Sequence, residues 1–137
     1  MLITRETDYA LRMLSALASG QQFTAGALCE QEMIPGQFGY KILKKLNPRG
    51  FVKIIRGKDG GCRLDCDLSQ VTLYHLMKAI GEDIYISSCM EPGYECKRRK
   101  ARNCRCSIHE RLACIQKSFN QELKKYTLLD LIQNDSE

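Results

Sequence analysis

The spacing of apolar residues predicts three helices in the first third of the chain. Apolar side chains recur there at steps of three and four, which places them on one face of a helix. The first helix follows Thr4 or Thr7 as its cap and runs to about Ser19. The other two are expected at residues 25–33 and at residues 37–46, with a Pro-Gly turn between them. Short helices joined by such a tight turn are typical of a helix-turn-helix unit.

A change of period after residue 50 predicts a β-hairpin. Residues 51–55 and 62–64 are rich in β-forming side chains, and a turn containing Asp-Gly-Gly lies between them. A further helix is expected at residues 73–80, where Gly81 closes it. Three helices followed by a hairpin with a glycine-rich tip describe a winged helix-turn-helix, in which the hairpin is the wing.

The last third of the chain predicts one long helix preceded by an irregular segment. Residues 82–88 indicate a linker or a short strand. Residues 89–106 are polar and basic, with Pro92 and Gly93, which is typical of a loop. The helix expected at residues 107–125 has one apolar face, formed by Ile108, Leu112, Ile115, Phe119 and Leu123. The fold class is therefore mainly α with a small β-hairpin wing: a winged helix-turn-helix plus a long C-terminal helix.

The formal net charge of +5 over 137 residues conceals two basic segments. Residues 36–58 carry seven bases and no acid, and residues 95–105 carry six bases against Glu95 alone. The rest of the chain is net negative, with 8 bases and 15 acids. A localised basic surface is the footprint of phosphate binding, whereas an unpartnered charge run only keeps a surface solvated. The acid-free segment favours double-stranded DNA as a partner.

The third predicted helix and the wing supply the candidate DNA contacts. The helix would lie in the major groove, with Gln37 able to donate and accept at base edges. The residues expected on its DNA-facing side are Gln37, Phe38, Tyr40, Lys41 and Lys44. Lys41, Lys44 and the adjacent Lys45 are expected to meet phosphates. Arg56 and Lys58 at the wing tip suit a narrow minor groove, where the potential is most negative.

Eight cysteines make up about 6% of the residues, and their context argues against structural disulfides. The chain begins without the charged-then-apolar layout of a signal peptide, and no apolar stretch reaches the length of a membrane span. A cytoplasmic location is therefore expected, where thiols stay reduced and metal or redox chemistry is favoured. Five of the cysteines lie within 26 residues: Cys89, Cys96, Cys104, Cys106 and Cys114.

This cysteine-rich segment is a candidate iron–sulfur site. Cys89, Cys96 and Cys106 are separated by six and nine residues; Cys104 lies two before Cys106, and His109 lies three after it. Thiolates and imidazoles are the donors that hold iron–sulfur clusters, and the dipole of a helix beginning near Cys106 favours a negatively charged centre. The irregular spacing differs from that of a zinc ribbon, although zinc and a thiol–disulfide switch stay open as alternatives.

The remaining cysteines have simpler expected roles. Cys29 and Cys114 are expected to be buried as small apolar residues. Cys62 and Cys66 flank the second strand of the wing; they could pair with each other, but nothing in the sequence requires it.

Several short segments match one known family. They are Leu2-Ile3-Thr4, Asp8-Tyr9-Ala10-Leu11, Lys41-Ile42-Leu43-Lys44-Lys45-Leu46, Gly50-Phe51-Val52 and Thr127-Leu128-Leu129-Asp130-Leu131. The wing Arg56-Gly57-Lys58-Asp59-Gly60-Gly61 is the most specific of them. On these residues the whole chain resembles the IscR/NsrR/CymR-type family of bacterial winged-helix iron–sulfur transcription regulators. The cysteine segment is longer than in the best-known members, and Cys62 stands where the family usually has an aromatic residue.

The resemblance implies a homodimer joined through the long final helix, a palindromic operator, and a three-cysteine site with a fourth ligand. Cys89, Cys96 and Cys106 match the three cysteines, and His109 matches the histidine of IscR-like members. Asp8 matches the aspartate that some nitric-oxide-sensing members supply from the other subunit. Cys104 is additional and is a further candidate ligand.

These observations predict a dimeric transcription regulator, a repressor, controlled by a 2Fe–2S cluster that senses iron–sulfur status, redox state or nitric oxide. Residues 1–82 would bind DNA, residues 83–106 would hold the cluster, and residues 107–137 would form the dimerisation helix and a C-terminal turn. The alternatives are a cluster-free regulator that senses redox state through thiols, and a zinc or cluster carrier that does not act on DNA. With two histidines and no catalytic constellation, an enzyme with a small-molecule substrate is not expected.

Overall fold

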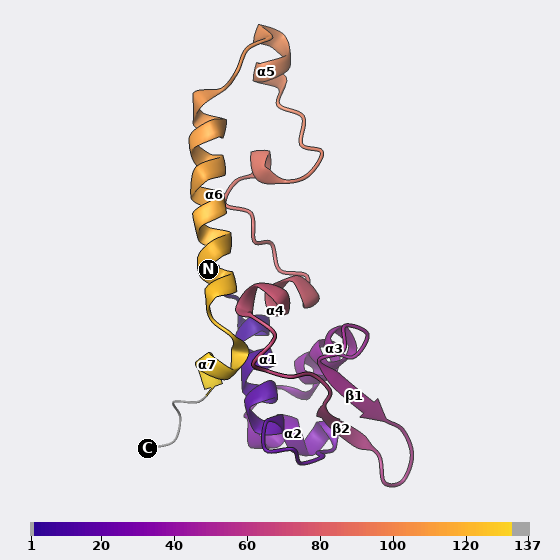
Figure 1. The fold of residues 1–137 in the computed structure, drawn as a ribbon. Coiled ribbons are helices and arrows are strands. Elements are labelled where there is room, and N and C mark those ends of the chain that lie inside the picture. Colours follow the sequence, from indigo (N-terminus) through magenta and orange to yellow (C-terminus); the bar gives the residue numbers. More distant parts are fainter. Residues whose placement is uncertain (1, 133–137) are drawn as a thin grey trace.

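The computed structural model describes residues 2–132, and it confirms the winged helix-turn-helix architecture (Figure 1). Met1 and residues 133–137 of the expected C-terminal turn lie outside the described residues. Helix α1 (Arg5–Leu17) begins at Thr4, whose side chain accepts a hydrogen bond from the backbone N–H of Thr7. The helix buries one stripe of its surface, formed by Thr7, Ala10, Met13, Leu14 and Leu17.

Helices α2 (Ala25–Gln31) and α3 (Gly36–Leu46) form the helix-turn-helix. Helix α2 ends two residues before the expected limit because Met33 adopts a positive φ of 53°, which no right-handed helix accommodates. The two helices meet closely at Gly39, where an added Cβ would lie 2.1 Å from the Sγ of Cys29. Cys29 is buried at this contact, as expected.

The wing consists of β1 (Val52–Ile55) and β2 (Gly61–Leu64), paired antiparallel with Val52 opposite Leu64. A third segment joins it, because Phe23 forms an isolated bridge with Cys62 through two backbone hydrogen bonds of 2.7 and 3.0 Å. Cys62 is buried under this bridge, so a small side chain fits where the family usually has an aromatic one.

Helix α4 (Leu73–Ala79) closes the winged part, and the end of the chain returns to pack against it. Thr72 caps α4 and forms a bridge with Thr127, just before the short helix α7 (Leu128–Ile132). Leu128 is fully buried in the same core as the helices of the winged part. The C-terminal turn is thus anchored in the core that residues 1–82 build.

The segment after α4 leads away from the winged part, and the long helix α6 (Ser107–Lys125) returns alongside it (Figure 1). This segment contains a 3₁₀ turn, η1 (Ser88–Met90), and helix α5 (Lys97–Arg102) at the far end of α6. The expectation of a loop over residues 89–106 is wrong for α5. Its Lys-Arg-Arg-Lys-Ala-Arg sequence consists of strong helix formers, and Asn103 ends it at a φ of 45°.

The apolar face of α6 is only partly covered in the single chain. Leu123 packs with Met77 of α4 and Ile84 in a second small core. Ile108 and Ile115, by contrast, are 58% and 55% exposed.

Candidate nucleic-acid interface and cysteine site

Helix α3 presents the predicted DNA-facing side chains to solvent. The exposed residues are Gln37, Phe38, Tyr40, Lys41 and Lys44, whereas Ile42, Leu43 and Leu46 point into the core. The ring of Phe38 packs edge-on against Tyr9 of α1, with centroids 6.2 Å apart. The amphipathic pattern of α3 therefore produces one polar, basic surface held on an apolar base.

A groove lies between α3 and the wing. It has a volume of about 570 Å³, and its basic members are Lys44 from α3 and Arg56 from the wing. Tyr40, Leu43 and Ile54 give the groove an apolar floor. Arg56 and Lys58 are exposed in the turn between β1 and β2. The groove therefore combines positive charge with apolar surface, which suits a sugar–phosphate backbone.

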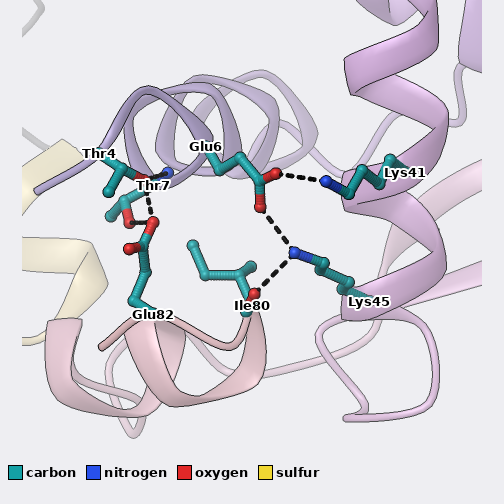
Figure 2. Close-up of polar contacts among 7 residues, drawn as sticks. All are labelled: Thr4, Glu6, Thr7, Lys41, Lys45, Ile80 and Glu82. Atoms are coloured by element: carbon teal, nitrogen blue, oxygen red, sulfur yellow. Dashed lines mark hydrogen bonds and ion pairs between the residues drawn. The ribbon is translucent and has the colours of Figure 1, made fainter. Parts of the chain in front are cut away.

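Two of the predicted phosphate-binding lysines are already engaged within the chain (Figure 2). Lys41 Nζ donates to Glu6 Oε1 at 2.9 Å, and Lys45 Nζ donates to Glu6 Oε2 at 2.7 Å. Lys45 also donates to the carbonyl oxygen of Ile80 at 2.9 Å. These hydrogen bonds, that from Lys45 first, lower the pKa of Glu6. Lys45 therefore faces the protein interior rather than a phosphate, while Lys41 stays mostly exposed on the α3 surface.

Glu82, three residues after the end of α4, is hydrogen-bonded to α1. The hydroxyls of Thr4 and Thr7 both donate to Glu82 Oε1, the second at 3.1 Å (Figure 2). Side chains of α1 are thus hydrogen-bonded both to α3 and to the residues that follow α4.

The proposed cluster ligands come together at the far end of α6. Cys89, Cys96, Cys106 and His109 all line one pocket of about 150 Å³. Cys106 is the N-cap of α6, and its Sγ accepts the backbone N–H of His109 at 3.5 Å. The helix therefore begins where the sequence predicted, with His109 in its first turn.

The donors fit an iron–sulfur cluster in kind and number: three thiols, one imidazole and a helix N-terminus. Within residues 2–132, however, no three Cys, His, Asp or Glu side chains are arranged closely enough to hold a metal ion. The four residues share a pocket, and a 2Fe–2S cluster would need two ligands at each of its two irons rather than three around one ion.

The two alternative fourth ligands lie outside this pocket. Cys104 is exposed; it lines one neighbouring cavity with Cys96 and another with Cys106, but not the pocket that all three of the other cysteines share. Asp8 lies on α1, paired with Arg12 at 2.7 Å.

The remaining cysteines differ in exposure. Burial raises the pKa of the thiols of Cys29, Cys62 and Cys66, which makes them poor nucleophiles and ligands. Cys62 and Cys66 are free thiols. Cys114, expected to be buried, is exposed on α6. It lies beside Ile115, on a part of the helix that nothing in the single chain covers.

Gln116 of α6 is a structural residue that the sequence reasoning missed. It is 7% exposed, its Oε1 accepts the N–H of Ile86 at 2.8 Å, and its Nε2 donates to the carbonyl of Ile84 at 2.9 Å. A signal was present: Gln116 stands four residues after Leu112 and three before Phe119, in the middle of the apolar stripe.

A family model and related proteins match this chain over nearly its whole length. The family model "Rrf2: Iron-dependent Transcriptional regulator" matches residues 3–134. The chain is 29% identical over 136 residues to protein aau3 of Rhizobium meliloti strain 1021, covering 97% of this chain and 86% of that protein. It is 28% identical over 137 residues to the HTH-type transcriptional regulator NsrR of Bacillus subtilis strain 168, covering 98% and 92%.

The fold of the chain is also similar to that of a solved regulator structure. The structure of CymR, the global cysteine regulator of B. subtilis, matches with a TM-score of 0.68 at 18% identity, covering 97% of each chain. Within residues 2–132, no helix has the length and apolarity needed to cross a membrane.

Proposed function

The chain belongs to the Rrf2 family of iron-dependent transcriptional regulators, and on this premise we propose a cytoplasmic, homodimeric repressor whose affinity for a palindromic operator is set by a 2Fe–2S cluster. Family membership confirms the resemblance that the sequence segments indicated. It also confirms that the protein is a regulator rather than an enzyme.

Helix α3 and the wing would bind the DNA together. Gln37 would read base edges in the major groove, and Arg56 and Lys58 would reach the adjacent minor groove. The backbone between the two grooves would lie in the cleft whose basic edges are Lys44 and Arg56. The apolar side chains of the groove would pack against deoxyribose, while Lys44 and Arg56 would contact phosphates.

The observation that carries the cluster proposal is the shared pocket of Cys89, Cys96, Cys106 and His109. These residues span twenty-one positions of the sequence, and the fold gathers them at the start of α6. A bound cluster would supply a centre that iron supply, oxidants or nitric oxide can alter. His109 is preferred as fourth ligand over Cys104, because His109 lines the one pocket that contains all three cysteines and Cys104 does not.

A second copy of the chain would cover α6. Ile108 and Ile115 leave apolar surface on the outer face of this helix, and a homodimer would bury it. The same copy is the only source from which Asp8 would reach the cysteine pocket, because Asp8 of the same chain is on α1 in the winged part.

Anaerobic purification followed by absorption spectroscopy and iron and sulfide analysis tests the cluster. The protein should be coloured, and Cys89→Ala, Cys96→Ala and Cys106→Ala should each abolish the visible absorption. Cys114→Ala is the matched control, because this thiol is exposed on the same helix and outside the pocket. A colourless protein with stoichiometric zinc would refute the proposal.

The DNA proposal is tested with a duplex selected by the protein from a randomised pool. Affinity should fall steeply with salt, because counterions are released from the phosphates. A flat salt dependence, or a selected sequence without two-fold symmetry, would contradict the proposal.

A cluster-free regulator that senses redox state through disulfides is the second candidate. Its support is that all eight cysteines are free thiols, and that those from Cys89 to Cys114 are at least partly accessible. Mass spectrometry after mild oxidation would favour it if a disulfide formed in a protein that takes up no iron.

A further inference from the structure

Residues 80–89 connect the winged part to the cysteine pocket. The start of this segment, residues 80–82, is hydrogen-bonded to α1 and α3. The carbonyl of Ile80 accepts a hydrogen bond from Lys45 of α3 at 2.9 Å. Two residues later, Glu82 accepts the hydroxyls of Thr4 and Thr7 from α1 (Figure 2). This end of the segment is thus in direct contact with the helix expected to read DNA.

The middle of the same segment, residues 84–86, is bound by the buried side chain of Gln116. Gln116 binds the carbonyl of Ile84 and the N–H of Ile86, and its amide also donates to Asn120 Oδ1 at 2.9 Å. Ile84 itself is 1% exposed and packs between α4 and α6. A buried amide is costly unless its polar atoms are paired. Gln116 is therefore stable in the apolar stripe because its amide pairs with the backbone of Ile84 and Ile86.

The segment ends at the first of the clustered cysteines. Cys89 lies three residues beyond Ile86, and its Sγ is 3.4 Å from the hydroxyl of Ser87. Binding or loss of a cluster by the four pocket residues would change what holds Cys89 in place. Only Ser87 and Ser88 separate Cys89 from Ile86, so a displacement of Cys89 would pull on the backbone that Gln116 binds.

We propose that residues 80–89 are a strap that couples the cysteine pocket to α3, with Gln116 and Lys45 as its positioning residues. The coupling rests on the proposed function, because it concerns how the cluster state reaches the DNA-binding helix. A change at the Cys89 end would reach the Lys45 contact along this short segment, in which Ile84 is buried between α4 and α6 and Glu82 is hydrogen-bonded to α1. A cluster can change DNA affinity only by the free-energy difference that it creates between two arrangements of the strap.

Hydrogen exchange measured by mass spectrometry tests the strap on the protein itself. The full chain is compared before and after anaerobic reconstitution with ferrous iron and sulfide. In the wild type, reconstitution should change the exchange rates of peptides covering residues 36–46. In Gln116→Ala the protein should still take up iron and sulfide, but that change should disappear. Gln121→Ala, on the exposed side of the same helix, is the matched control and should respond as the wild type does.

Operator affinity provides the second readout. The ratio of affinities with and without the cluster should fall by about 2- to 30-fold in Gln116→Ala relative to the wild-type ratio. Lys45→Met, which removes the other anchor, should lower the ratio as well. If Gln116→Ala does not fold, Gln116→Glu keeps the acceptor for Ile86 and loses the donor to Ile84, so the ratio should fall for it too.

The outcomes separate the two proposals. A wild-type protein that takes up no iron and sulfide would overturn the proposed function and the strap with it. A wild-type protein that takes up the cluster but shows unchanged exchange in α3 would overturn the strap alone. Folded Gln116→Ala or Gln116→Glu protein with an undiminished response would also overturn it, because the amide would then have only a structural role.

Discussion

Gly39 fixes how α3 sits on α2, and replacing it with alanine should destabilise the protein. An added Cβ would lie 2.1 Å from the Sγ of Cys29, whereas non-bonded heavy atoms rest at roughly 3.5–4.0 Å. Either the thiol or the helix therefore has to move by roughly 1.5 Å. Cys29 is 4% exposed, so its side chain has little free space to turn into. Overpacking of this kind costs about 1–3 kcal/mol, and the size of the overlap points to the upper end.

The higher helix propensity of alanine offsets part of this loss of stability. Alanine is favoured over glycine in a helix by about 1 kcal/mol. The expected net loss for Gly39→Ala is therefore about 2 kcal/mol, and α3 should also present its DNA-facing side chains less well. In a Cys29→Ala background the clash is absent, because the next contacts of the added Cβ lie at 3.5 and 3.7 Å. There Gly39→Ala should stabilise the protein by up to about 1 kcal/mol.

Urea unfolding followed by far-UV circular dichroism measures this double-mutant cycle, at one protein concentration because a dimer makes stability concentration-dependent. Gly26→Ala is the control, since a Cβ on that residue of α2 meets nothing within 4 Å. It should not change with the Cys29 background. An equal cost of Gly39→Ala in both backgrounds would refute the steric explanation and leave a backbone origin instead.

Three further predictions follow from the polar network, the wing and the long helix. The bonds from Lys45 and Lys41 lower the pKa of Glu6 below its ordinary value of 4.5, so they stabilise the fold above that pH and are lost as the pH falls through the lowered value. Glu6→Gln should therefore lower the free energy of unfolding, measured with urea near neutral pH, by about 1 kcal/mol or less, and this difference should shrink in acid. Arg56→Ala, at the edge of the groove proposed to hold the sugar–phosphate backbone, should weaken binding and reduce the salt slope by about 1 in a filter-binding or anisotropy titration. Ile115→Asp should give a monomer in analytical ultracentrifugation; an unchanged dimer would place the interface elsewhere.

The winged part of the fold was predictable because its signals are local. Apolar spacing, threonine caps and the Asp-Gly-Gly turn each act within a few residues, and all of them agree. Errors arose where two local rules conflicted. Residues 97–102 carry a charge run, which indicated a loop, but the same residues have high helix propensity and form α5. Met33 ended α2 early through a left-handed backbone that residue type alone does not indicate.

The candidate site was predictable only as far as residue type and spacing reach. The pattern placed Cys89, Cys96, Cys106 and His109 together, and they do line one pocket. It could not assign Lys45, because a lysine on a basic helix has the same local signal whether it meets a phosphate or a buried carbonyl. The deciding partners, Glu6 and Ile80, are 39 and 35 residues away along the chain.

Gln116 shows how such long-range partners leave a trace in the sequence. An apolar residue at this point of the stripe would bury more readily, since an unpaired amide costs about 1–3 kcal/mol on burial. The glutamine is therefore stable there only because residues 84–86 run beside α6 with backbone groups that no strand or helix satisfies. A lone amide within an apolar helical stripe thus indicates an extended segment lying against that helix. In this chain, that segment is the one leading from the DNA-binding part to the first clustered cysteine, so the exception to the helical pattern marks the connection between the two sites.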